Sequence, residues 1–171
     1  RDGAAAPRGG GVLNNGTLSL DRVTVTQNTE NSGGPAGFDL GGGGIFNGEN
    51  STLNLTDSTV SDNATLNQPA GGIYGFFGST INITRSTVTG NVGADVAGGL
   101  RSLGDATIVN STFSGNTSTA GTAEAAHIGN AGVVDQQLLG FGRIDVHSAR
   151  HHPVAETIGD EHEAVGIHVP D

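Results

Sequence analysis

The chain has 171 residues, a formal net charge of −10 and 30 glycines, and it contains no cysteine, methionine, tryptophan or lysine. Glycine at this density disfavours a helical domain, because each glycine inside a helix costs about 1 kcal/mol relative to alanine. The missing cysteines exclude disulfides and thiolate metal sites, the acidic charge disfavours nucleic acid as a partner, and no apolar run is long enough to span a membrane.

Four copies of one sequence pattern fill residues 10–116. Each copy has two glycines and an aliphatic residue, then two apolar residues separated by one polar residue, then Val or Phe three residues before Asn. The second apolar residue always lies five residues before the Val or Phe and eight before the Asn, whereas successive asparagines are 35, 28 and 25 positions apart. Because surface loops absorb insertions, the fixed segment is the structured part of each copy.

In chain order the glycine pairs begin at Gly10, Gly43, Gly71 and Gly98. The apolar residues that follow alternate with Thr, Ser or Asn, a period of two that indicates half-buried strands. Units this short cannot bury an apolar face alone, so they must stack on one another. We therefore predict an all-β fold, a right-handed single-stranded parallel β-helix (a solenoid) of about four coils with three short strands in each, followed by an irregular C-terminal cap or tail.

Three rows of inward apolar side chains are predicted to fill the same three positions in every coil. The first row is Val12, Ile45, Ile73 and Leu100, the second is Leu20, Leu55, Ile83 and Ile108, and the third is Val25, Val60, Val88 and Phe113. A narrow interior filled in this way explains how only 40 Leu, Ile, Val and Phe residues form a core.

An asparagine closes each copy, at Asn28, Asn63, Asn91 and Asn116. Asparagine tolerates the left-handed backbone conformation of a tight corner and can bond its own backbone. Stacked on one another, the four side chains are predicted to form an amide ladder, with simple turn residues as the alternative. The glycine pairs are predicted to lie at tight corners that leave no room for a side chain. A phosphate-binding loop is disfavoured, because no phosphate-binding pattern accompanies them.

The glycine pairs and the Phe113-Ser114-Gly115-Asn116 segment resemble the repeat of the chlamydial polymorphic outer-membrane protein family and related bacterial β-helix surface proteins. The resemblance covers residues 10–116, and the first three copies depart from it by having Val in place of Phe. It implies a secreted or surface-displayed passenger associated with the outer membrane and used in adhesion. It brings no catalytic residues and no cofactor.

Two classes of function fit this repeat. The first is a noncatalytic extracellular or cell-surface module, an adhesin or a passenger or stalk segment that binds a polysaccharide or a host surface protein. The second is part of a β-helix polysaccharide lyase or glycoside hydrolase, which as a hydrolase needs two carboxylates about 5 to 9.5 Å apart. The carboxylates of the repeats occupy different coil positions, at Asp21, Asp39, Glu49, Asp57, Asp62, Asp95 and Asp105, so we favour the noncatalytic module.

One outward row carries charges of alternating sign. Two residues after the second apolar residue stand Arg22, Asp57, Arg85 and Asn110 in successive copies. We expect an exposed ion ladder between adjacent coils that adds a few tenths of a kcal/mol per pair, with a substrate-binding row as the alternative.

The composition divides the chain into an N-terminal flank (1–9), the repeats (10–132) and an acidic tail or cap (133–171). Residues 123–132 are predicted to be a degenerate fifth copy, with Ala125-Ala126-His127 in the place of Gly10-Gly11-Val12. All six histidines lie C-terminal to the four full copies, at positions 127, 147, 151, 152, 162 and 168, where we expect a solvated segment rather than a metal site. Alternation at residues 144–146 and 165–169 predicts two short strands that cover the open end of the stack.

Overall fold

The computed structural model describes residues 4–5, 9–31, 41–119, 124–134 and 143–146, and in 4–5, 124–134 and 143–146 only the backbone. In these ranges the chain is all-β, and every pairing between two strands is parallel. No helix capable of crossing a membrane occurs in the described ranges.

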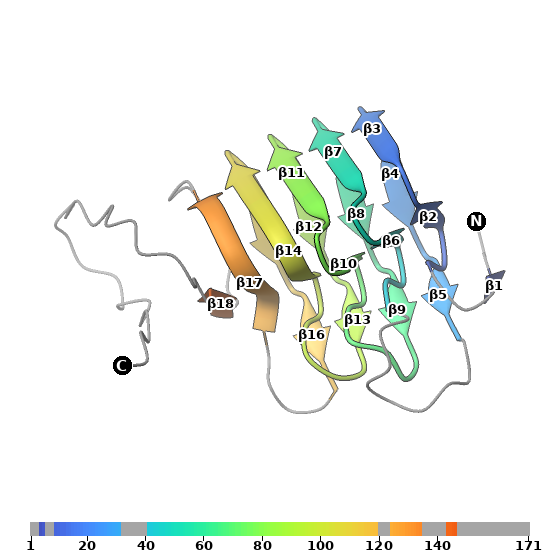
Figure 1. Ribbon diagram of the computed structural model, residues 1–171. Helices are drawn as coiled ribbons and strands as arrows, with labels where there is room; N and C mark the ends of the chain where they lie inside the picture. The colour runs from blue at the N-terminus through green and yellow to red at the C-terminus, as the bar shows by residue number, and fades with distance from the viewer. Residues whose placement is uncertain (1–3, 6–8, 32–40, 120–123, 135–142, 147–171) are drawn as a thin grey trace, which may run out of the picture.

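Each repeat contributes strands to the same sheets in the same order (Figure 1). The strands after the glycine pairs are β2 (Val12–Asn14), β6 (Ile45–Asn47) and β10 (Ile73–Gly75), and the next are β3 (Thr17–Asp21), β7 (Thr52–Thr56) and β11 (Thr80–Thr84). In the fourth repeat these two positions run together as β14 (Leu100–Val109), which joins both sets into one sheet. The third position forms a separate sheet of β4 (Thr24–Thr26), β8 (Thr59–Ser61), β12 (Thr87–Thr89) and β15 (Thr112–Ser114).

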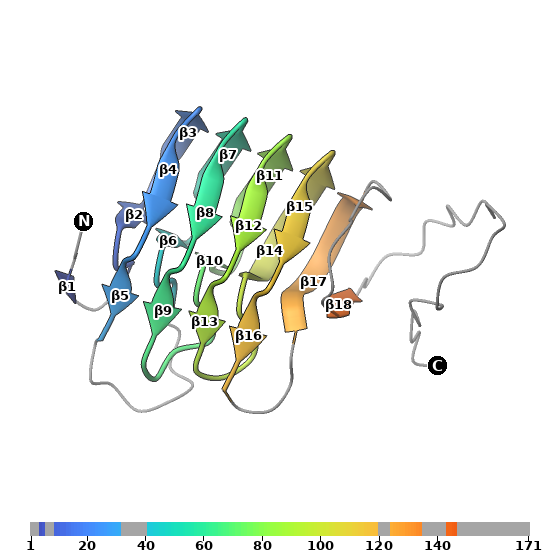
Figure 2. The same cartoon turned by 180° about the vertical axis from the view of Figure 1, so that it is seen from behind.

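A fourth strand in each repeat was not predicted. It follows the corner asparagine and comprises β5 (Thr29–Glu30), β9 (Ala64–Thr65), β13 (Val92–Gly93) and β16 (Thr117–Ser118). Together with β1 (Ala4–Ala5) these strands form a five-stranded sheet (Figure 2). The prediction of three strands per repeat was wrong because a two-residue strand shows no alternation, although its backbone still bonds to the neighbouring repeat.

Two further strands lie beyond the fourth repeat. Strand β17 (Glu124–Val134) pairs with β14, and β18 (Arg143–Val146), which includes the predicted strand at 144–146, pairs with β17. Leu100 pairs with Ala126, and Arg101 pairs with His127. Placing His127 at the Leu100 position was therefore wrong by one residue, because this copy lacks the glycine pair and corner asparagine that set the register elsewhere. The predicted strand at 165–169 and the five histidines after residue 146 lie outside the described residues.

The three predicted apolar rows lie in register and form one buried cluster. Ile83, for example, pairs with Leu55 on one side and Ile108 on the other, and all three side chains are at most 1% exposed. The core also contains a row that the prediction omitted, namely Leu53, Ile81 and Ala106, with Leu18 partly buried against them. Two N-terminal row members, Val12 and Leu20, are likewise only partly buried.

The register predicts that a charge at Ile83 has no partner in the core. We expect Ile83→Asp to lower the free energy of unfolding by more than about 3 kcal/mol, because an unpaired carboxylate enters a dry apolar row. Thr84→Asp is the matched control, since this side chain is next along β11 and only half-buried. Urea unfolding of both variants measures the difference, and equal losses would contradict the register.

Candidate functional site

The four corner asparagines form a buried column through the stack. The Nδ2 group of Asn28 donates to Asn63 Oδ1, that of Asn63 to Asn91 Oδ1, and that of Asn91 to Asn116 Oδ1, each at 2.9 Å. The backbone NH of each donor residue bonds to the same oxygen at 3.0 Å. Each of these Oδ1 atoms therefore accepts two hydrogen bonds from the preceding repeat, which fixes the position of one repeat on the next.

The glycine pairs lie against this column. A Cβ on Gly44 would lie 2.9 Å from Asn63 Nδ2, and a Cβ on Gly43 would overlap the carbonyl oxygen of Ala64. The same relation recurs one repeat later, where a Cβ on Gly72 would lie 3.1 Å from Asn91 Cγ. Glycine is needed here because the corner asparagine and the fourth strand leave no room for a side chain.

The left-handed backbone conformation occurs one residue before each corner asparagine. Its members are Gln27, Asp62, Gly90 and Gly115, with φ between 54° and 63°. The expectation that asparagine itself adopts this conformation was wrong, because the asparagine backbone must aim its NH at the next Oδ1. A second left-handed row coincides with the predicted charge row, Arg22, Asp57, Arg85 and Asn110.

In the charge row, an ion pair between side chains joins the second and third repeats. Arg85 Nε and Nη2 donate to the two carboxylate oxygens of Asp57, both at 2.8 Å. Arg22 instead pairs at 2.9 Å with Asp21, its neighbour in the chain, so the ladder does not extend to the first repeat as expected. The hydrogen bond from Arg85 lowers the pKa of Asp57 below its ordinary value of 3.8.

A column of serines forms a second corner that the sequence analysis missed. The backbone NH of Val23 donates to Ser58 Oγ at 3.0 Å, that of Ser58 to Ser86 Oγ and that of Ser86 to Ser111 Oγ, both at 3.1 Å. Serine stands three residues after the second apolar residue in three repeats, a constant spacing that was a usable signal. The first repeat has Val23 at this position, and the valine side chain offers no acceptor.

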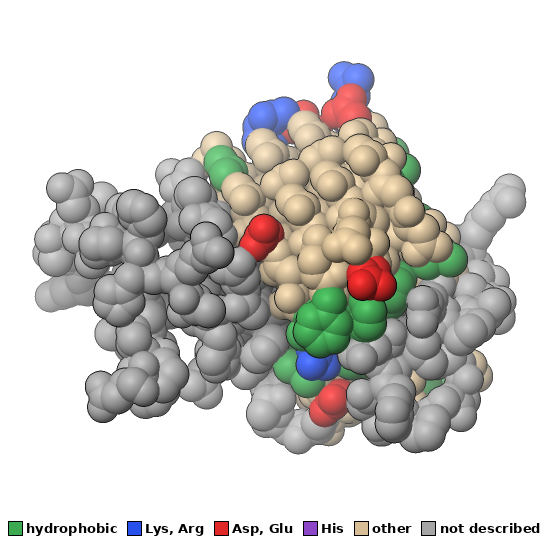
Figure 3. Space-filling model, viewed as in Figure 1, with side chains coloured by type: hydrophobic (Ala, Val, Ile, Leu, Met, Phe, Trp, Pro, Cys, Tyr) green, Lys and Arg blue, Asp and Glu red, His purple; other side chains and the backbone are tan. Residues whose placement is uncertain are grey.

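We call the outward side chains of β3, β7, β11 and residues 105–109 of β14 the outer threonine face. They are Thr17, Ser19, Asp21, Thr52, Asn54, Thr56, Thr80, Asn82, Thr84, Asp105, Thr107 and Val109. Asn82 Nδ2 donates to Asn54 Oδ1 at 2.8 Å, and Asn54 Nδ2 to Ser19 Oγ at 3.3 Å. Figure 3 shows this side of the molecule as a broad surface of mostly uncharged polar groups.

An aromatic cluster borders the outer threonine face. Phe46 and Tyr74 lie side by side on β6 and β10 with ring centroids 5.6 Å apart, and both are buried. Phe76 and Phe77 follow β10 and come just before Thr80 of the face, with ring centroids 5.1 Å apart. Phe77 is 54% exposed, so this end of the cluster is open to solvent.

The carboxylates show no catalytic arrangement in the described part of the chain. Asp21 and Asp57 are paired with arginines, and Asp39 lies outside the described residues. Three carboxylates at separate places are exposed and one is half-buried, namely Glu49, Asp62, Asp105 and Asp95. Glu30, which the prediction did not include, is fully buried, and its carboxylate oxygens have no hydrogen-bond partner among the described residues. No group of three or more His, Cys, Asp or Glu side chains with metal-binding geometry occurs among the described residues.

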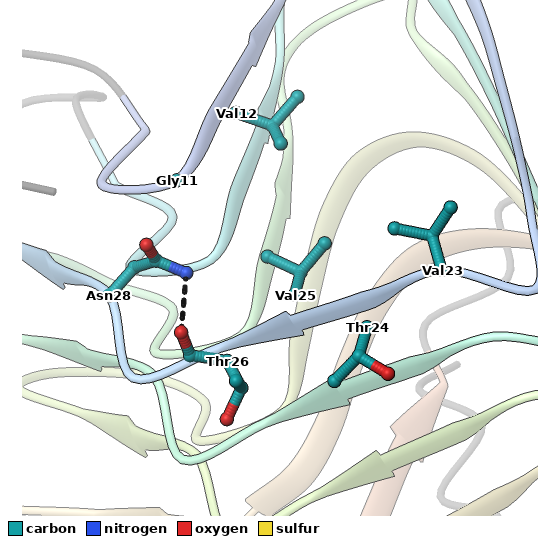
Figure 4. Close-up of a pocket in the computed structure, with 7 residues that line it drawn as sticks. All are labelled: Gly11, Val12, Val23, Thr24, Val25, Thr26 and Asn28. Carbon is teal, nitrogen blue, oxygen red and sulfur yellow. Dashed lines mark hydrogen bonds between the residues drawn. The ribbon is translucent and has the colours of Figure 1, made fainter. Parts of the chain in front are cut away.

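A hollow of about 320 Å³ opens at the N-terminal end of the stack (Figure 4). It is lined by Gly11, Val12, residues 23–26 and Asn28. The lining thus comprises the first members of two apolar rows and the first asparagine of the column.

Comparisons with protein-family models, with curated proteins and with solved structures find no match for this chain. The resemblance to the polymorphic outer-membrane protein repeat therefore stays a prediction.

The asparagine column predicts a large effect for Asn91→Ala. The substitution removes the donor to Asn116 and the acceptor for two groups of Asn63, and we expect a loss of about 3 kcal/mol in the free energy of unfolding. Asn82→Ala removes the side-chain hydrogen bond from Asn82 to Asn54 on the half-buried outer face and should cost less than about 1 kcal/mol. Urea unfolding of the two variants compares them, and an equal effect would show that burial of the column contributes nothing.

The Asp57–Arg85 pair predicts a small stability term that depends on pH. Because the folded-state pKa of Asp57 is lowered, its contribution is present above the ordinary value of 3.8 and is lost as the pH falls through the lowered folded value. Asp57→Asn should lower the melting temperature slightly at pH 7, and the difference should vanish in stronger acid. Asp62→Asn, in the same repeat, serves as the control in thermal melts from pH 7 down to pH 2.

Proposed function

We propose that this chain is a right-handed, single-stranded parallel β-helix of about four coils that acts as a noncatalytic extracellular or cell-surface module. Its outer threonine face, with the aromatic cluster at one edge, binds a neutral polysaccharide. The observation that carries the proposal is the half-exposed Phe77 near the uncharged hydroxyl and amide side chains of β7 and β11.

The order of the sheets supports the β-helix. At each strand position the strands stack in the order of the repeats, as β3, β7, β11 and β14 do, and each repeat passes through all of its strand positions before the next repeat begins. Parallel strands joined by crossovers of this kind are right-handed in nearly all proteins, because strand twist favours that hand. On this reading one repeat is one coil.

The spacing of the outer threonine face suits an extended polymer. Neighbouring parallel strands lie about 4.8 Å apart, and outward residues recur about every 6.6 Å along a strand. Side chains of β7 and β11 thus present donors and acceptors at regular intervals without any charge. A polysaccharide offers hydroxyl groups at regular intervals along an extended chain, so many weak hydrogen bonds form together.

The aromatic edge supplies what the hydroxyl lattice lacks. Sugar rings have apolar faces, and sites for such ligands combine aromatic surface with a few polar groups that fix orientation. Phe77 provides this surface next to Thr80, the first outward residue of β11. A net charge of −10 favours a neutral polymer over an acidic one, which the chain repels.

Binding is tested by retention of the chain on insoluble neutral polysaccharides such as cellulose, chitin and xylan. We expect Phe77→Ala to weaken retention about fivefold or more, as for an aromatic anchor in an interface. Leu66→Ala is a matched control, because Leu66 is also 54% exposed but follows β9 in a different sheet. Unchanged melting temperatures in both variants would assign the loss to binding, and retention that is equal for both would refute the proposed face.

The same incubations distinguish the module from the enzyme fragment. Soluble reducing ends or unsaturated products should stay at background, because the described carboxylates are paired with arginines or dispersed. Product release abolished by a single aspartate substitution would establish the lyase or hydrolase alternative instead.

A further inference from the structure

Arg101 is a cationic side chain without an anionic partner in the described part of the chain. Arg22 and Arg85 form ion pairs with aspartates, whereas Arg101 forms no ion pair and donates no hydrogen bond among the described residues. Its Nε atom is buried, but its two Nη groups are not, and the residue as a whole is half-buried. In a chain of net charge −10, Arg101 therefore presents unused N–H donors to solvent.

Aromatic rings hold Arg101 in place. Its Cζ atom lies 5.8 Å from the centroid of the Tyr74 ring, within the range of a cation–π contact. Tyr74 is fully buried, and its ring centroid lies 5.6 Å from that of Phe46 and 6.3 Å from that of Phe76. The guanidinium thus rests on a rigid support, so a ligand that binds it does not have to immobilise a flexible side chain.

Arg101 lies on the same strand as part of the outer threonine face. Alternation along β14 sends Arg101, Leu103 and Asp105 to the same side, and Arg101 lies at most about 13 Å from Asp105 along the strand. Leu103, between them, packs on the aromatic cluster. The backbone NH of Asp105 donates to Ser79 O at 2.9 Å, which places the turn that carries Phe77 beside β14. Figure 3 shows hydrophobic and basic side chains together at the edge of the uncharged polar surface.

A carboxylate is the anion that suits this position. Guanidinium N–H groups form paired hydrogen bonds with the two oxygens of a carboxylate, as Arg85 does with Asp57. Sugars that carry a carboxylate are uronic acids, and their rings have the same apolar faces as neutral sugars. Such a unit can therefore contact the aromatic cluster while its carboxylate bonds to Arg101.

The surrounding charges limit how many carboxylates the ligand can carry. No second unpaired arginine occurs among the described side chains, and the outer threonine face itself carries Asp21 and Asp105. A densely acidic polymer is repelled by these groups and by the net charge of −10. One carboxylate on Arg101 lies farther from Asp105 than the screening length of about 8 Å, so a sparsely substituted polymer escapes most of this repulsion.

Resting on the proposed function, we propose that the same surface selects a mainly neutral polysaccharide that carries isolated uronic acid groups, with Arg101 binding the carboxylate. The outer threonine face and Phe77 bind the neutral part of the polymer. The two Nη groups of Arg101 donate to one acidic group. Arg101 is thus a specificity residue, and binding of the neutral part does not depend on it.

The test compares xylan substituted with glucuronic acid and the same polymer after its carboxyl groups have been reduced to alcohols. Affinity electrophoresis of the full chain measures binding to each form. We expect the acidic form to bind about three- to tenfold more tightly, and this difference should shrink at high salt. Arg101→Gln should remove the difference and leave the affinity for the reduced form unchanged. Arg101→Lys should keep only part of it, because an ammonium group lacks the paired donors.

Arg22→Gln is the matched control, because it removes the same charge from an exposed side chain that is already paired with Asp21. This variant should keep the preference for the acidic form. Equal affinity of the parent chain for the two forms, or a preference that survives Arg101→Gln, would overturn the inference. Loss of both forms in Arg101→Gln would overturn it as well, since Arg101 would then be a support of the aromatic cluster. Displacement of the acidic xylan by polyglutamate would assign the carboxylate to a protein partner instead.

The outcome is separable from that of the proposed function. Phe77→Ala should weaken binding of both forms of xylan, whereas Arg101→Gln should affect the acidic form alone. A parent chain that binds neither form would refute both proposals, and one that binds both forms equally would refute only the role of the uronic acid. Should Arg101→Gln fail to fold, the reduced polymer still decides the question, since that comparison uses the parent chain.

Discussion

The buried asparagine column and the glycine pairs depend on each other. The amides of Asn63 and Asn91 occupy the space that a side chain on Gly44 or Gly72 would need. The amide oxygens of Asn91 and Asn116 each accept one hydrogen bond from the backbone NH and one from the Nδ2 group of the asparagine in the preceding repeat. This contact sets the register of the stack, so that connections of very different length still deliver equivalent residues to the same place.

Once the register is set, the inside and the outside of the sheets follow from it. Alternation sends Leu53 and Leu55 into the core and leaves Thr52, Asn54 and Thr56 half-buried on the outer threonine face. Threonine suits these half-buried outward positions, and Asn82 and Asn54 bond to each other there. The outward side chains of β7 and β11 are all uncharged, in a chain of net charge −10.

The sequence predicts those parts of the structure that repeat with a detectable period. The rows through Leu55 and Val60 and the positions of the asparagines could be predicted because their spacings are fixed. A register shift of one residue would turn these side chains to the opposite face of the sheet. The fourth strand escaped prediction because Ala64–Thr65 is too short to alternate. The burial of Phe46 and Tyr74 escaped prediction as well, since alternation marks both positions as outward, and only the fold shows that they pack on each other.

The two ends of the stack are not equivalent, because the asparagine column has a direction. From Asn28 to Asn116, each Oδ1 that accepts does so from the asparagine of the preceding repeat, although the Nδ2 groups of the last three asparagines also donate back to a carbonyl oxygen of that repeat. At the C-terminal end β17 continues the parallel pairing on β14. The contact between one oxygen and the asparagine of the preceding repeat therefore recurs in a single sense along the stack, and it holds equivalent residues of successive repeats in register.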